Sequence, residues 1–183
     1  MSWQAALQPL SPARAGNLAG LLEASGPEPA ACHCTAYHGI GGERPTEARA
    51  CRARLAGASP ADGFLLYNGA EPVLWAQCAP WDTFAVLRAR PQPPGTWALT
   101  CVVVPPGRRR SGLVHELLRR LPRTLSARGA VRLVAFAHRL GPTYSSPLPE
   151  LPERACLAAG MRLERDDAEC PLYALDLASA LPD

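Results

Sequence analysis

The chain has 183 residues, of which 48% are hydrophobic, and its formal net charge at pH 7 is +3. That length allows one domain with a sizeable core, and no run of about 18 apolar residues is present to cross a membrane. We therefore expect a single globular domain over residues 1–183, with no membrane partner. The small charge does not indicate a nucleic-acid binder. All 19 basic residues are arginine, which points to compositional bias more than to selected basic patches.

The cysteine content and the first residues indicate in which cellular compartment the protein is expected. There are seven cysteines, an odd number. The first residues lack a basic stretch followed by an apolar run, so a signal peptide is not expected. Free thiols in a reducing cytoplasm are the natural interpretation.

The first third of the chain reads as one strand and two helices. Residues 3–10 are expected to form a strand, followed by a helix over 11–25 with a leucine stripe. Residues 25–45 are rich in Gly, Pro and Cys and are expected to be a loop. A second helix is expected over 45–57, where Gly57 ends it.

The middle of the chain predicts a hairpin and a buried strand. Residues 63–80 contain two apolar segments around Asn68-Gly69, a typical hairpin turn. A proline-containing linker over 81–96 leads to an apolar strand over 97–105.

A helix and a strand are expected next. The helix follows Arg110 and carries leucines at 113, 117, 121 and 125. Pro122 is expected to interrupt it, at a cost of about 3 kcal/mol unless the helix kinks. Residues 131–138 read as a strand and 139–149 as a loop.

The chain closes with a short helix over 150–160 and a last strand over 170–177. Strand hairpins mixed with helical crossovers predict an α/β fold on one mixed sheet.

The segment over 102–121, VVVPPGRRRSGLVHELLRRL, places a tight turn between a strand and a helix. The unpaired N–H groups and the positive dipole end of a helix N-terminus favour an anion there. Arg109 adds charge, and Gly112 permits close approach to the backbone. The segment lacks the Gly-Lys-Ser/Thr ending of a P-loop and two of the three glycines of a dinucleotide fingerprint.

These residues resemble the acetyl-CoA-binding motif of the GNAT acetyltransferase superfamily, a strand followed by Arg/Gln-x-x-Gly-x-Gly/Ala. Arg109 and Gly112 match it, whereas Val114 replaces the usual last small residue and Arg110 stands where glycine is common. Further segments, from LQPLSPARAGNLAGLL through CHC to CLAAGMRLE, fall in the order seen in a bacterial GNAT subfamily with a Cys-Trp-Cys segment near its start.

The resemblance implies a single mixed, mostly antiparallel central sheet with flanking helices and splayed fourth and fifth strands. It also implies acetyl-CoA as co-substrate and direct acetyl transfer to an amine of a small molecule or protein. A homodimer through the C-terminal strand is common in the superfamily.

The resemblance further implies how the cofactor binds. The N–H groups of Arg110 to Val114 would bind the pyrophosphate, and the pantetheine arm would lie between Val102–Val104 and Val134–Phe136. A backbone N–H near Val102 would polarise the thioester carbonyl. The implied cofactor-binding residues are Val102, Val103, Val104, Arg109, Arg110, Ser111, Gly112, Leu113 and Val114.

The usual catalytic residues of the family are not matched. Its fourth-strand glutamate corresponds to Thr100 or Cys101, and its thiolate-protonating tyrosine corresponds to Cys156, for which core packing is the alternative. His138 is a candidate base, against a surface histidine, and Tyr144 is a candidate acid, against simple packing.

The segment CHCTAYH offers other chemistry. Cys32, Cys34, His38 and Cys51 are the residue types that bind zinc, but the C-x-C spacing is tighter than usual and no second pair matches it, so no metal is expected. The segment could instead line an acceptor pocket, be buried, or be redox-sensitive.

Three functions remain: an active N-acetyltransferase, a CoA-binding regulatory module without catalysis, and a nucleic-acid binder that uses the arginines around the turn. The sequence favours the first.

Overall fold

The computed structural model describes residues 5–32, 34–40, 44–139, 151–168 and 170–180. Its strands form one sheet in the order β1-β2-β3-β4-β5-β7-β6. Only the β4–β5 pair is parallel. The strands are β1 (Ala5–Pro9), β2 (Phe64–Asn68), β3 (Glu71–Pro80), β4 (Thr96–Val103), β5 (Arg132–Phe136), β6 (Arg162–Arg165) and β7 (Leu172–Asp176).

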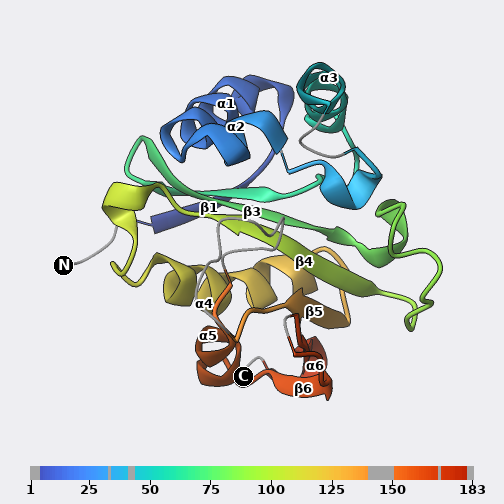
Figure 1. The fold of residues 1–183 in the computed structure, drawn as a ribbon. Coiled ribbons are helices and arrows are strands. Elements are labelled where there is room, and N and C mark those ends of the chain that lie inside the picture. The colour runs from blue at the N-terminus through green and yellow to red at the C-terminus, as the bar shows by residue number, and fades with distance from the viewer. Residues whose placement is uncertain (1–4, 33, 41–43, 140–150, 169, 181–183) are drawn as a thin grey trace.

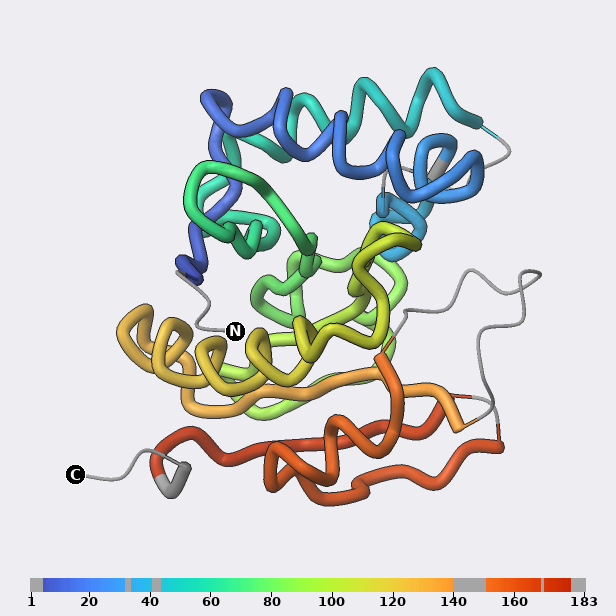
Figure 2. Tube along the Cα trace, turned by 90° about the vertical axis from the view of Figure 1, so that its left-hand side faces the viewer, coloured from blue at the N-terminus to red at the C-terminus, as the bar shows by residue number. Residues whose placement is uncertain are grey.

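Helices cover both faces of this sheet. On one side lie α1, α2 and α3, and on the other lie α4 and α5 (Figure 1). The view in Figure 2 shows α1–α3 again as a separate layer, with β6 and β7 at the opposite end. The helices are α1 (Ala15–Ala24), α2 (Pro27–Cys32), α3 (Pro45–Leu55), α4 (Leu113–Ser126), α5 (Glu153–Ala158) and α6 (Leu177–Ala180). The short 3-10 turns are η1 (Pro12–Arg14), η2 (Ala36–His38), η3 (Trp81–Thr83) and η4 (Pro106–Arg108). The predicted mixed sheet with flanking helices is confirmed.

Three buried clusters pack against the sheet in the described residues, and two of them show how β4 is covered on both faces. The predicted leucine stripe of α4 packs in the larger core together with Leu99 and Val102 of β4. On the opposite face, Leu18 and Leu22 of α1 pack in a second core with Val103. Strand β4 therefore lies between both helical layers, and its residues alternate between them as a doubly covered strand requires.

Four elements differ from the sequence predictions, one of them α6, which begins at Leu177 where the chain was expected to close with a strand. Helix α2 lies in the segment expected to be a loop, and β6 forms an edge strand where none was predicted, because its exposed residues show no alternation. Pro122 does not end α4, which continues to Ser126. Its ring is buried among the leucines, and this packing holds the helix together despite the missing N–H. No helix in the described ranges is long and apolar enough to cross a membrane.

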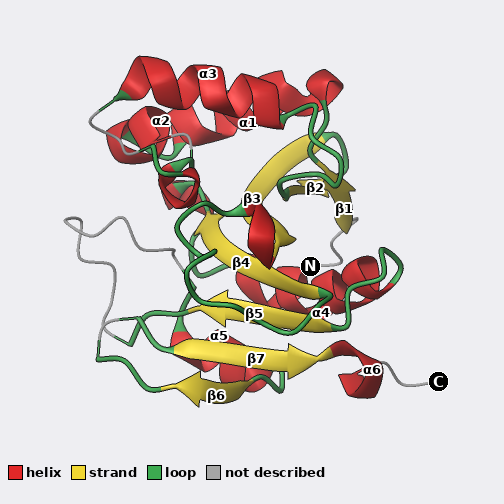
Figure 3. Cartoon of the chain, turned by 90° about the vertical axis from the view of Figure 1, so that its right-hand side faces the viewer, coloured by secondary structure: helices red, strands yellow, loops and turns green. Residues whose placement is uncertain are grey.

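Strand β4 separates from β5 along its second half. The separation begins at a β-bulge. Gln77 pairs with Cys101 and Cys78 pairs with Leu99, so Thr100 is an extra residue in β4. Pairing with β5 ends at Leu99 and Ala135, and Figure 3 shows the two strands diverging toward their C-terminal ends.

The predicted splay is confirmed, but its boundary on β5 was wrong. Val134 and Ala135 are still paired with β4, through Ala98 and Leu99. The opening on the β5 side therefore begins at Phe136, because the β4 bulge, which starts the divergence, lies one residue beyond the last pair.

Candidate active site

The turn between β4 and α4 exposes a row of backbone amides. Arg110 and Gly112 both adopt left-handed backbone conformations, with φ values of 62° and 85°. Within the described ranges, the N–H groups of Arg110 to Val114 have no backbone acceptor, and the first helical bond is donated by Glu116 N to Gly112 O at 3.0 Å. Such a row at the start of a 14-residue helix is a concave anion site.

The three consecutive arginines have different surroundings. Arg108 forms an ion pair with Glu71 of the β2–β3 hairpin. Arg109 folds back, and its Nε donates to the carbonyl oxygen of Val104 at 3.4 Å. Arg110 is exposed beside the row of amides. Of the three side chains, those of Arg109 and Arg110 are therefore placed to add positive charge at the turn.

The edge of β4 that faces β5 is open beyond Leu99. Among the described residues no strand pairs with this edge over 100–103. The side chains of Val102 and Val104 are buried on the α4 face, whereas Val103 packs toward α1. These residues therefore offer backbone groups, not side chains, to an extended ligand running from the turn into the opening.

A buried polar cluster lies against the bulge, on the side of the sheet covered by α1–α3. We call it the Asp62 cluster: His38, Arg52, Asp62, Gln77 and Thr100. The Asp62 carboxylate accepts from Arg52 Nη1 at 2.5 Å and from Gln77 Nε2 at 3.2 Å, and it bonds His38 Nε2 at 2.8 Å. Thr100 in turn donates to Gln77 Oε1 at 3.0 Å. The cluster thus joins η2, α3, β3 and the bulge of β4.

The electrostatics of the cluster favour an ionised carboxylate. Burial alone would raise the pKa of Asp62, but the hydrogen bond with His38 and the charge of Arg52 outweigh it and hold that pKa below its usual range. Arg52 also donates to the carbonyl oxygen of Cys34 at 2.6 Å, and its guanidinium lies 5.3 Å from the centre of the Trp75 ring. Both charges are thus compensated in the interior.

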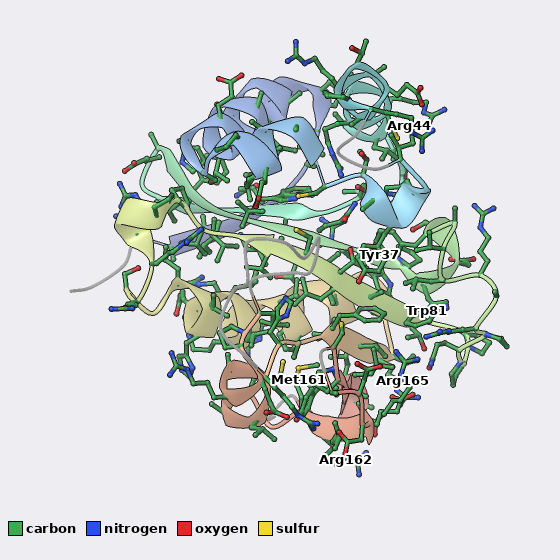
Figure 4. All side chains as sticks on the ribbon, viewed as in Figure 1. Tyr37, Arg44, Trp81, Met161, Arg162 and Arg165 are labelled. Atoms are coloured by element: carbon green, nitrogen blue, oxygen red, sulfur yellow. The ribbon has the colours of Figure 1, made fainter. Side chains whose placement is uncertain are left out.

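Aromatic contacts connect η2 to the end of β5. The His38 ring lies 5.1 Å from that of Phe84, and the Tyr37 ring lies 5.5 Å from that of Phe136. Trp81 stacks on Phe136 at 6.1 Å. Figure 4 shows Tyr37 and Trp81 on the same side of the molecule, where η2 faces the sheet. Phe84, Trp81 and Phe136 belong to one buried cluster, so these contacts pack η2 against the sheet beside the end of β5.

The Cys-x-Cys segment has no metal-binding arrangement in the described structure. Cys34 Sγ lies 3.3 Å from Cys101 Sγ, and His38 bonds Asp62. Cys51 is buried in α3, and the Cys32 side chain lies outside the described residues. Within the described ranges, no three His, Cys, Asp or Glu side chains gather to hold a metal ion.

The predicted catalytic residues lie in three different situations. His138 is half-buried after β5, and its backbone bonds Leu151 and Glu153. Cys156 is completely buried in the core below the sheet, where burial and then Glu153 raise its pKa to about 12. That position favours the packing alternative. Tyr144 lies outside the described residues.

The sequence predicted the turn between β4 and α4 but did not indicate the Asp62 cluster. His38 was considered as a zinc ligand and, with the rest of the CHCTAYH segment, as part of an acceptor-pocket lining or as a buried residue, whereas Asp62, Arg52 and Gln77 were not singled out. These residues come from separate segments with no motif spacing. The only available indication was that polar residues stand beside strands expected to be buried.

Comparisons with known proteins place this fold among acetyltransferases. No family model matches the sequence. The curated proteins searched include no match either. Solved structures do match. The GNAT domain of PAT from S. lividans superposes with a TM-score of 0.63 at 15% identity, covering 94% of this chain and 90% of that one.

Two further matches were solved with cofactor. YncA from Salmonella typhimurium, with its cofactor acetyl-CoA, superposes with a TM-score of 0.59 at 16% identity, covering 98% of each chain. PaiA N-acetyltransferase from Thermoplasma acidophilum, in complex with coenzyme A, gives 0.59 at 10% identity, covering 96% of this chain and 99% of that one. At such identities the likeness shows that this chain has the GNAT fold.

Proposed function

We propose that this protein is an acetyl-CoA-dependent N-acetyltransferase that transfers the acetyl group directly to an amine. The observation that carries the proposal is the turn between β4 and α4, where, within the described residues, the row of unbonded amides at 110–114 adjoins the open edge of β4. A pyrophosphate fits the first feature and an extended pantetheine chain fits the second. Solved proteins of the same fold hold CoA or acetyl-CoA.

The residues would act as follows. The N–H groups of Arg110, Ser111, Gly112, Leu113 and Val114 bind the diphosphate, with Arg109 adding charge. The backbone of Val102, Val103 and Val104 lines the pantetheine arm. An N–H donor near Val102 stabilises the oxyanion that forms when the amine attacks the thioester carbonyl.

A catalytically inactive CoA-binding module is the second candidate. One observation favours it: neither Thr100 nor Cys101 carries a carboxylate at the position where the family often has one, and Cys156 is buried. Both functions require the cofactor site, so binding and turnover must be measured separately.

The cofactor site is tested by isothermal titration with acetyl-CoA. Arg110→Glu places a carboxylate beside the diphosphate site, and we expect it to weaken binding by about tenfold or more, the effect of losing one charge-assisted contact. Arg123→Glu is the matched control, because it makes the same charge change on an exposed residue near the other end of α4. No binding by the wild-type protein at millimolar acetyl-CoA would rule out both functions.

A further inference from the structure

The position of His38 suggests catalysis more than surface exposure or packing. Its side chain is 10% exposed and its partner Asp62 is 3% exposed. It stands on η2, whose neighbour Tyr37 contacts Phe136 at the point where β5 leaves β4. Through Asp62 and Gln77 it is also connected to Thr100 in the bulge of β4. His38 therefore lies near the opening from which an acceptor would approach.

The hydrogen bond fixes which nitrogen carries the proton. A carboxylate only accepts, so the neutral His38 ring must donate from Nε2 to Asp62 Oδ1. Its Nδ1 then keeps a free lone pair, and no protein partner for Nδ1 is found within the described ranges. This is the arrangement in which a carboxylate orients an imidazole as a base and stabilises the imidazolium that forms.

The charges around His38 do not repel a protonated amine. Asp62 is balanced by Arg52, so the group is neutral overall while His38 is neutral. The Phe84 ring lies 5.1 Å from the His38 ring, and Tyr37 precedes His38 on the same turn. Arg44 donates to the carbonyl oxygen of the following residue, Gly39, at 2.7 Å on the exposed side. The Phe84 ring is fully buried, whereas Tyr37 and His38 are partly exposed. An approaching alkylammonium therefore meets the edge of η2, where the Nδ1 lone pair of His38 is the basic group.

We propose that His38, oriented by Asp62, is the general base that deprotonates the acceptor ammonium, in place of a carboxylate on β4. This inference rests on the proposed function. The ammonium transfers a proton to Nδ1, and the free amine attacks the thioester carbonyl carbon. A C–N bond forms, the C–S bond breaks, and the CoA thiolate takes the remaining extra proton from the acetylated nitrogen. His38 then returns its proton to water.

The test uses His38→Gln, a conservative variant. The glutamine amide occupies the place of Nε2, so the hydrogen bond to Asp62 is kept while the basic nitrogen is lost. Acetyl-CoA binding is measured by titration, and CoA release is measured with spermidine, ethanolamine and a peptide with a free N-terminus. We expect the dissociation constant for acetyl-CoA to change by less than about twofold, while kcat falls by about 100-fold or more.

The pH profile separates a base from a merely structural residue. In the wild type, kcat/KM should rise with pH through a limb that reports the deprotonation of the catalytic base. His38→Gln should lose this limb and regain activity at alkaline pH, where more amine is already free. Asp62→Asn should shift the limb to lower pH, because the imidazolium loses its counter-charge.

The outcomes are distinct. Absence of acetyl-CoA binding by the wild type overturns the proposed function itself. Binding without transfer to any of the three amines overturns the assignment of a catalytic base and favours the inactive module. Transfer with an unchanged profile in His38→Gln, or with the limb lost only in His138→Gln, assigns the base elsewhere.

Discussion

Arg110 and Gly112 illustrate how single residues shape the turn between β4 and α4. The left-handed conformation is unfavourable for residues with a Cβ and is adopted by glycine at little cost. Arg110 adopts it nonetheless, with φ 62°, at the position where the family often has glycine. At this position the chain therefore combines a left-handed backbone with an exposed guanidinium beside the amides.

Asp62 makes a residue-scale prediction about stability and pH. Its pKa is lower in the folded protein than in the unfolded chain, so the stabilisation is full above the ordinary value of about 4 and is lost as the pH falls through the folded value. At pH 7, Asp62→Asn leaves Arg52 buried without a counter-charge. We expect this to cost about 3–5 kcal/mol of unfolding free energy in urea titrations.

Asp62→Asn should also make the unfolding free energy depend less steeply on pH in the acid range. Below pH 4 the unfolding free energy of the wild type should fall more steeply than that of Asp62→Asn. Glu116 is the comparison, since hydrogen bonding from Arg119, against opposing burial and together with Arg120, lowers its pKa to about 2. If Glu116→Gln flattens the curve as much as Asp62→Asn does, the buried ion pair is not the main acid-sensitive group.

At the scale of elements, the sequence predicted correctly those elements whose residue pattern lies within one continuous segment. The strand, turn and helix over 96–126 follow from an apolar run, a glycine and a leucine stripe, all within one segment. The edge strand β6 depends on pairing with β7 and has little pattern of its own. The Asp62 cluster depends on four elements meeting, which a single sequence does not indicate.

The junction before β2 provides an element-scale prediction. A Cβ on Gly63 would lie 2.3 Å from Trp75 Cη2 and 2.5 Å from the carbonyl oxygen of Ala76. The carbonyl oxygen of Gly63 itself accepts from Leu10 N at 2.8 Å, so the backbone is held in place. Because Trp75 is fully buried, neither partner can yield freely. We expect Gly63→Ala to cost about 1–3 kcal/mol.

Urea unfolding measures this cost, with Gly57→Ala as the matched control. A Cβ at Gly57 would make only ordinary contacts, 3.7 Å from the Arg54 carbonyl oxygen and 4.0 Å from the Pro12 ring. Equal midpoints for the two variants would mean that β2 and β3 can separate without loss.

For the whole molecule, arginine pairing bears on the type of partner. Arg119 and Arg120 both bond Glu116, and Arg108 bonds Glu71. These ion pairs reduce the positive potential that a nucleic-acid surface would need. The unbonded amides of the turn, in contrast, are not neutralised by any acid in the described ranges, so the anion site is more specific than a general basic face.

The difference between an anion site and a basic surface predicts which ligand stabilises the whole molecule against unfolding. A cofactor that runs from the turn into the opening contacts only the folded state, so acetyl-CoA at 100 times its dissociation constant should add about 2.7 kcal/mol to the unfolding free energy. For a domain of this size, that corresponds to a rise in melting temperature of about 5–10 °C. Duplex DNA at the same concentration should give no comparable rise. The opposite result would be a rise in melting temperature with DNA that disappears as salt is raised, and no rise with acetyl-CoA. It would assign the arginines around the turn to nucleic-acid binding, because binding through phosphate neutralisation depends steeply on salt.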